Sequence, residues 1–184
     1  GLGDVYKRQG SLRAKADAIR TRLAKSINTK YQENPAYYEN FSKRIKEALE
    51  LYKARTITEA EYLAKMRDIL EDYRTGKSAI AYPDRIRANV HAQAFYGVLT
   101  AIFSNEKLSV EPDFAAEMAL DITTIIEKHS QVDWTHNLTI HDRISQDIDD
   151  LFYRYQKERG LVLSFDVIDM IIENVKTVAL RRFA

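Results

Sequence analysis

Three short patterns contain residue types used in nucleotide hydrolysis or nuclease chemistry. The first is Gly76-Lys77-Ser78, the order in which a phosphate-binding loop ends. Such a loop also requires a glycine five residues before Gly76, and Glu71 occupies that position. We therefore interpret Gly76 as the C-cap of a helix, where a glycine adopts positive φ at little cost.

The other two patterns begin in the connector that follows. Pro83-Asp84 has the order that opens one class of Mg²⁺-dependent nuclease motif. That motif continues with Glu-x-Lys, but no glutamate of this chain is followed two residues later by lysine. Arg85 and His91 have the spacing of the Arg–His pair of some helical ribonucleases, so a stand-alone ribonuclease remains an alternative.

Metal and thiol chemistry find little support in the sequence. The chain has no cysteine, which excludes disulfides, thiolate catalysis and Cys-ligated metals. His136 and His141 are five residues apart, whereas two metal ligands on one helix face need the i, i+4 spacing. We interpret His141 as a partly buried packing residue. The sequence thus predicts no catalytic residue, no bound cofactor and no metal site in this chain.

Composition and periodicity indicate the fold class. The 184 residues are 45% hydrophobic and 30% charged, with only 6 Gly and 3 Pro. Few turn-forming residues and apolar positions at helical spacing predict an all-α fold, a single globular bundle of about seven helices with no significant sheet. No stretch reaches the ~18 apolar residues that span a bilayer, and no charged-then-apolar leader is present. We therefore expect a cytoplasmic protein with no membrane partner.

Seven amphipathic segments account for the expected helices. Capping signals precede several of them: Ser11, Asn34-Pro35, the Thr58-to-Glu61 capping box and Ser164. The fourth helix is expected to carry Ile86 to Ile102 on one side, and the fifth follows a linker over residues 104–112.

The sixth segment, residues 134–159, has the widest apolar stripe and ends at Gly160. We expect the other helices to pack around it. Trp134, which should open this helix, Ile148 and Phe152 are its expected core residues.

Domain organisation follows from the same pattern. Residues 1–10 lack periodicity and resemble adapter-like, non-native sequence, so we set them apart as a leader. Residues 11–184 form the expected helical domain, which the connector divides into sub-bundles 11–76 and 84–184. We also expect the chain to be the end of a longer reading frame.

Charge is distributed unevenly although the net charge is only +1. Residues 1–55 carry 13 Lys and Arg against 6 Asp and Glu, whereas residues 106–150 carry 3 against 11. The simpler interpretation is that these segments attract each other within one fold. The alternative is a basic end that contacts DNA weakly and non-specifically, with Arg20, Arg22 and Lys25 as the phosphate contacts.

Several strings, taken in order, carry a family resemblance. They are residues 34–38 (Asn-Pro-Ala-Tyr-Tyr), 41–45, 57–63, Tyr82-Pro83, Asp133-Trp134 and 148–152. Together they resemble the C-terminal helical region of the R (restriction) subunit of type I restriction enzymes. The resemblance covers residues 11–184.

The resemblance implies a role in assembly. In that family the R subunit combines a nuclease domain and ATP-driven motor domains, which use ATP and Mg²⁺, with a helical tail. The tail docks the DNA translocase to the methyltransferase and specificity subunits. It implies that this chain is a non-catalytic docking region, for which we expect Asp147, Asp149, Asp150 and Asp166 to face a basic partner. A generic helical adaptor is the remaining alternative.

Overall fold

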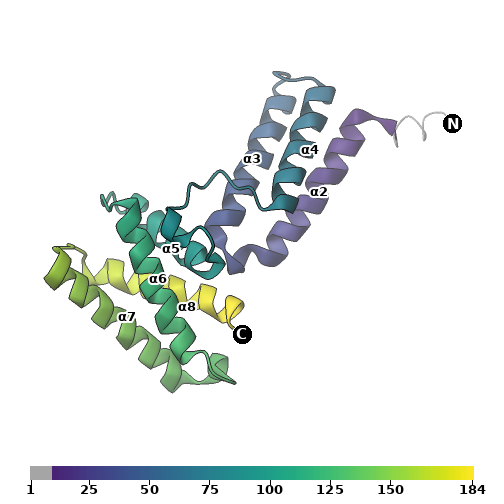
Figure 1. Cartoon of the computed structure of the whole chain (residues 1–184). Helices are drawn as coiled ribbons and strands as arrows, with labels where there is room; N and C mark the ends of the chain where they lie inside the picture. The colour runs from purple at the N-terminus through teal and green to yellow at the C-terminus, as the bar shows by residue number, and fades with distance from the viewer. Residues whose placement is uncertain (1–9) are drawn as a thin grey trace. The chain divides into compact units, whose positions relative to one another are not determined.

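The computed structural model describes residues 10–184, and all regular secondary structure in this range is helical. Seven α-helices and three short 3₁₀ turns are present, and no β-strand occurs among these residues (Figure 1). The helices are α2 (Leu12–Lys30), α3 (Pro35–Lys53), α4 (Glu59–Thr75), α5 (Val90–Asn105), α6 (Pro112–His129), α7 (Leu138–Arg159) and α8 (Phe165–Arg182). The all-α class and the number of helices are confirmed.

The chain divides into two compact units. Unit 1 contains α2, α3 and α4 and includes the chain up to Tyr31 and Tyr37–Ile80. Unit 2 contains α5 to α8 and comprises Gln32–Ala36 and Ala81–Ala184. Residues 1–9, most of the expected leader, lie outside the described residues. No helix of residues 10–184 is both long and apolar enough to cross a membrane.

Local signals set the helix ends of unit 1 as the sequence predicts. The Thr58 hydroxyl accepts a hydrogen bond from the Glu61 N–H, and the Glu61 carboxylate accepts one from the Thr58 N–H, each at 3.1 Å. This reciprocal capping box satisfies two N–H groups that α4 itself leaves unpaired. Gly76 ends α4 with a φ of 76°, and Pro35 occupies the first position of α3.

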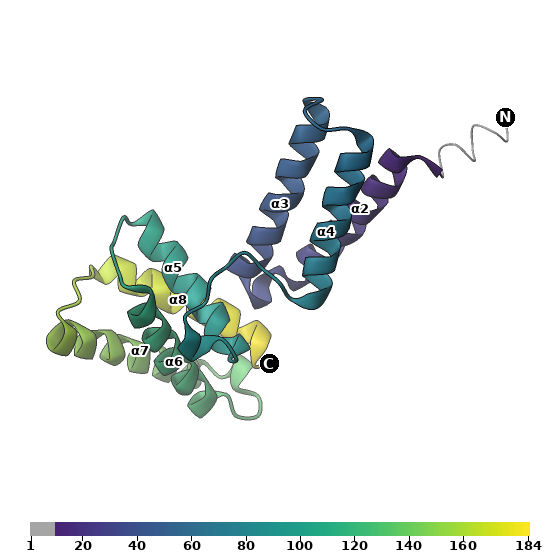
Figure 2. The ribbon, with the colours of Figure 1, turned by 45° about the horizontal axis from the view of Figure 1, so that its top comes forward.

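Polar bonds at the edge of an apolar core link α2 to α4 in unit 1. The Tyr62 hydroxyl donates to Asp17 at 3.0 Å, and the Ser26 and Tyr73 hydroxyls lie 2.6 Å apart. Because residue numbers rise along both helices at these two contacts, α2 and α4 run parallel. Figure 2 shows α3 and α4 side by side, joined by a short turn. Beneath these bonds the buried core includes Leu23, Phe41, Tyr62 and Met66.

The central helix of unit 2 is α5 rather than the long helix that the sequence favoured. Six consecutive residues of α5, from Ala94 to Leu99, are buried, so the middle of this helix is enclosed on all sides. Gly97 allows the backbone at Ala36 to approach, because a Cβ at position 97 would lie 2.7 Å from the Ala36 Cβ. Unit 2 therefore packs around α5, with α6 and α8 against it.

The expected start of the longest helix is wrong. Trp134 lies in the 3₁₀ turn Trp134–His136, and α7 begins at Leu138 with Asn137 as its N-cap. Asp133 adopts a φ of 60°, which turns the chain before the helix. Leu138, the first residue of α7, is 76% exposed. Trp134, Ile148 and Phe152 are nevertheless all buried.

A similar correction applies at the start of α5. Ile86 belongs to the 3₁₀ turn Asp84–Ile86, and Asn89 caps a helix that begins at Val90. Val90 is 59% exposed, so it does not share a buried face with Ala94.

Candidate functional site

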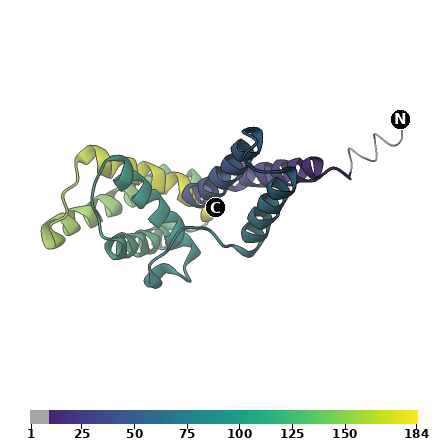
Figure 3. The same cartoon turned by 90° about the horizontal axis from the view of Figure 1, so that it is seen from above.

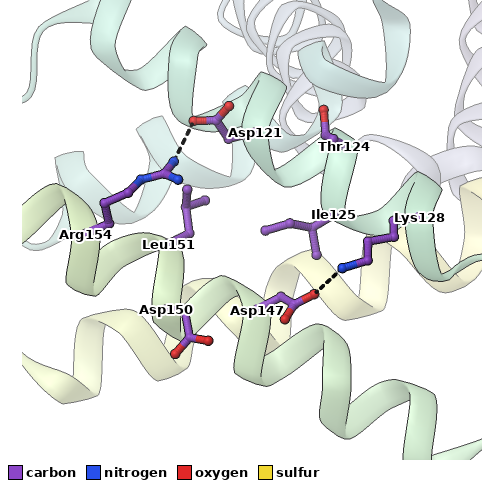
Figure 4. A pocket seen from close by; sticks show the side chains of 8 residues that line it. All are labelled: Asp121, Thr124, Ile125, Lys128, Asp147, Asp150, Leu151 and Arg154. Carbon is purple, nitrogen blue, oxygen red and sulfur yellow. Dashed lines mark ion pairs between the residues drawn. The ribbon is translucent and has the colours of Figure 1, made fainter.

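A groove of about 460 Å³ lies between α6 and α7 in unit 2 (Figure 4). Its lining mixes apolar side chains with charges of both signs: Asp121, Thr124, Ile125, Lys128, Asp147, Asp150, Leu151 and Arg154. Two ion pairs cross from one helix to the other. Arg154 Nη2 lies 3.7 Å from an Asp121 oxygen, and Lys128 Nζ lies 3.8 Å from an Asp147 oxygen.

Asp147 also forms a short contact with a histidine that the sequence analysis did not single out. His129 Nε2 lies 2.6 Å from Asp147 Oδ2, and the His129 side chain is only 13% exposed. A carboxylate beside an imidazole orients the ring in many hydrolases, but that chemistry also needs a nucleophile in reach of the ring. Residues 129 and 147 are on different helices, so only the packing of α6 on α7 reveals this pair.

Tyr155 makes a further polar contact between α6 and α7. Its hydroxyl donates a short hydrogen bond to the carboxylate of Asp121. Burial, together with this bond, raises the pKa of Tyr155 well above its ordinary value of 10.0. The phenol therefore stays protonated and acts as a fixed donor. It takes part in holding the two helices together.

Arg159 makes a comparable contact near the end of α7. It lies 2.6 Å from Glu117 and places its guanidinium 4.2 Å from the centre of the Phe114 ring. Together with the pairs of the groove, this contact gives many charged groups of α6 and α7 a partner on the other helix. These charged side chains therefore stabilise the packing of α6 on α7.

The four acidic residues expected to face a partner are placed in two different situations. Asp147 pairs with His129 and Lys128, and Asp150 accepts a hydrogen bond from Gln146 at 2.9 Å. These two carboxylates therefore have partners within unit 2.

Like Asp150, Asp149 and Asp166 are exposed. Among the described residues neither carboxylate has a hydrogen-bond or ion-pair partner. Asp166 lies in the first turn of α8 and the other three on α7. A partner would find its available charge at Asp149 and Asp166.

Exposed apolar side chains surround Asp166 where α7 turns into α8. Val162 and Phe165 are 83% and 84% exposed, and Met170 is 37% exposed. We call Val162, Phe165, Asp166, Asp169 and Met170 the α7–α8 corner; Figure 3 shows the connection as the yellow-green loop at one end of the unit. Apolar residues in a sequence normally indicate buried core positions, so the sequence pattern alone did not reveal this exposed surface.

The chain was compared with known protein families. It matches, over residues 6–179, the family described as "Type I restriction enzyme HindI endonuclease subunit-like, C-terminal". The chain belongs to this family. The match covers most of the described residues of both units, and it confirms the resemblance noted in the sequence.

One relative is the "Type I restriction enzyme HindI endonuclease subunit" of Haemophilus influenzae. It is 25% identical to this chain over 127 residues, which make up 69% of this chain and 12% of that relative. The chain thus corresponds to a small part of the relative's length. No solved structure matches it.

Within this family member, the predicted DNA-contacting residues lie on two faces of α2. Arg22 and Lys25 line a groove between α2 and α4. Arg20 lines a separate groove between α2 and α3, and its Nη2 lies 3.5 Å from Asp17. The three side chains therefore do not form one surface, and their contact with DNA stays a prediction.

The Arg85 and His91 of the ribonuclease alternative each have another partner in unit 2. Asp113 accepts two hydrogen bonds from Arg85, at 2.9 and 2.8 Å. Arg182 Nε donates to His91 Nδ1 at 3.0 Å, and the His91 ring lies 4.3 Å from that of Phe183. These contacts give both side chains a structural role in unit 2.

Proposed function

We propose that this chain is a non-catalytic docking region of a type I restriction enzyme. In this proposal it joins the ATP-dependent translocase and endonuclease to the methyltransferase and specificity subunits. Membership of the C-terminal family of HindI-like endonuclease subunits supports the restriction context. The parent polypeptide would use ATP and Mg²⁺ in domains beyond the part of the relative that this chain matches.

The α7–α8 corner is the observation that carries the docking step. Three of the nine large apolar side chains exposed among residues 10–184 fall within residues 162–170. Exposed apolar clusters with a polar rim are typical of protein-binding surfaces. Val162 and Phe165 would supply affinity by burial, while Asp166 and Asp169 would orient a basic partner.

The interface between α6 and α7 supports the same proposal, because it lies on the side of α7 that faces the rest of unit 2. Its charges pair across the two helices, as at Asp121 and Arg154 or at Asp147 and Lys128. These pairs keep α7 in place while its outer face, including Asp149, remains available. A docking surface benefits from such support because less ordering is needed on binding.

A capture experiment tests the proposal. The tagged chain is used to capture the purified methyltransferase–specificity complex of the cognate system, alongside the full R subunit as a positive control. We expect the unmodified chain to capture the complex, and Val162→Ser/Phe165→Ser to reduce capture at least roughly tenfold, the effect of losing about 1.4 kcal/mol. Asp149→Lys/Asp166→Lys should mainly slow association.

A matched control uses two exposed apolar residues elsewhere in unit 2. Val132 and Leu138 are 90% and 76% exposed, and Val132→Ser/Leu138→Ser should leave capture unchanged. If the chain captures nothing where the full R subunit does, the docking role is wrong. If Val162→Ser/Phe165→Ser captures the complex as well as Val132→Ser/Leu138→Ser does, docking occurs but uses a surface other than the α7–α8 corner.

A further inference from the structure

One groove of unit 1 lies between α2 and α4 and plays no part in the proposed docking through unit 2. It has a volume of about 660 Å³. We call it the α2–α4 groove, and its lining comprises Arg22, Leu23, Lys25, Ser26, Thr29, Lys30, Leu70, Tyr73 and Arg74. Both walls contribute cations, with Arg74 on α4 and the other three on α2.

The charge of this groove is one-sided. Four of its nine lining residues are Lys or Arg and none is acidic. The neighbouring groove between α3 and α4 is balanced instead, because Arg44 and Lys65 line it together with Glu47 and Asp68. Helix surfaces of unit 1 are therefore not uniformly basic, and the α2–α4 groove concentrates positive charge.

The floor of the groove is apolar and its neutral polar groups are already paired. Leu23 is 2% exposed, and Leu70 and Tyr73 are partly buried. The Ser26 hydroxyl lies 2.6 Å from that of Tyr73, and the Thr29 hydroxyl donates to the Lys25 carbonyl at 3.0 Å. The cations are thus the main groups that the groove offers for polar contact with a ligand.

We propose that the α2–α4 groove binds an acidic amphipathic helix of a partner polypeptide. An apolar floor between cationic walls is complementary to a helix with an apolar stripe flanked by Glu and Asp. On α2 the lining runs from Arg22 to Lys30, about 12 Å at 1.5 Å per residue. That length accommodates two to three turns of the partner, with carboxylates reaching Arg22, Lys25, Lys30 and Arg74.

A nucleic acid fits these features less well. Phosphate contacts use hydroxyl and backbone N–H donors as well as cations. Here the Thr29 hydroxyl already donates to the Lys25 carbonyl, and the Ser26 hydroxyl is bonded to that of Tyr73. Single strands also bind by stacking bases on exposed aromatic rings. The Tyr73 ring instead packs edge-on against Phe41, with 5.3 Å between ring centres.

Fluorescence anisotropy with a designed peptide tests this proposal on the whole chain. The probe is a labelled helix of about 18 residues with Leu at i, i+3, i+4 and i+7 and Glu on both flanks. We expect it to bind, and Arg22→Glu/Lys25→Glu to weaken binding roughly tenfold or more. Amide signals of residues 22–30 and 70–74 should shift in NMR spectra on titration.

The controls separate groove binding from general charge attraction. Lys43 and Lys53 are exposed on α3 and line none of the α2–α4 groove, so Lys43→Glu/Lys53→Glu should leave the affinity unchanged. A peptide with Lys in place of Glu should not bind. Arg74→Glu, a change on the opposite wall, serves as the second variant if the double variant loses helix content.

Three results would overturn the proposal. The first is no binding of the acidic peptide, and the second is binding that the groove variants leave unchanged. The third is a duplex DNA that binds more tightly than the peptide and depends on Arg22 and Lys25, which would assign the groove to nucleic acid. Each result would leave docking through the α7–α8 corner untouched, because that surface lies in unit 2.

Discussion

Trp134 offers a direct test of how unit 2 is held together. The indole is 3% exposed, and its Nε1 donates a hydrogen bond of 2.8 Å to the Phe183 carbonyl just beyond α8. Its own carbonyl oxygen lies 3.0 Å from His141 Nε2, one turn into α7. This single residue thus connects the turn before α7 with the end of α8.

Trp134→Ala should lower the free energy of unfolding of unit 2 by about 3–5 kcal/mol, the usual range for truncating a large buried aromatic. Most of this loss is burial and packing, and the hydrogen bond to Phe183 contributes about 1 kcal/mol of it. Trp134→Phe keeps a ring in the site but loses the donor. We expect that variant to lose about 1–2 kcal/mol.

Urea unfolding followed by far-UV circular dichroism is the appropriate assay. Trp134 is the only tryptophan of the chain, so its fluorescence cannot report on variants that lack it. Tyr153→Ala is a matched control, because Tyr153 is 60% exposed on the neighbouring α7. That change should shift the free energy by no more than about 0.5 kcal/mol.

A loss of less than about 1 kcal/mol in Trp134→Ala would refute this prediction, because a residue with these contacts must then contribute little to the fold. A loss of similar size in Tyr153→Ala would also contradict it. In that case the burial of Trp134 would not explain the loss of stability in Trp134→Ala.

Four further predictions concern other features. Gly160→Ala should destabilise the chain by about 1 kcal/mol in urea melts, because position 160 has a φ of 66°. Gly97→Ala should also destabilise it in urea melts, although alanine has the better helix propensity, because the new Cβ meets Ala36. Burial and the nearby Arg182 lower the pKa of His91 below 6.5, so the unfolded chain binds the extra proton first. Unfolding free energy should therefore fall as pH drops below about 6.5, and less so in His91→Gln. Finally, the purified chain should release no phosphate from ATP and cut no DNA with Mg²⁺; activity that follows the chain through successive columns would contradict its non-catalytic assignment.

Local signals in the sequence were sufficient for the helices and most of their ends. Thr58 with Glu61, Gly76, Gly160 and Ser164 act through atoms a few residues away, so their roles can be recognised without tertiary information. The family resemblance also rested on short strings in order along the chain. The start of α7 was misjudged because the four-residue step from Trp134 to Leu138 resembles one helical turn, although Asn137 between them is the cap.

Periodicity also could not rank the helices by burial. The stripe of α7 is easily seen because its other face is polar, whereas α5 is apolar on all sides and has weak amphipathic contrast. Its central position depends on α6, α8 and the approach of Ala36 to Gly97. These are contacts between residues distant in sequence, which no local pattern encodes.

The candidate surfaces were decided by tertiary structure for the same reason. Sequence alone indicated that Asp147 and Asp166 are acidic and that Phe165 is apolar. Only packing pairs Asp147 with His129 from another helix, leaves Asp166 without a partner among residues 10–184, and exposes Phe165. Residue type thus determined which chemistry was available, while the arrangement of helices determined which groups pair internally and which remain for a partner.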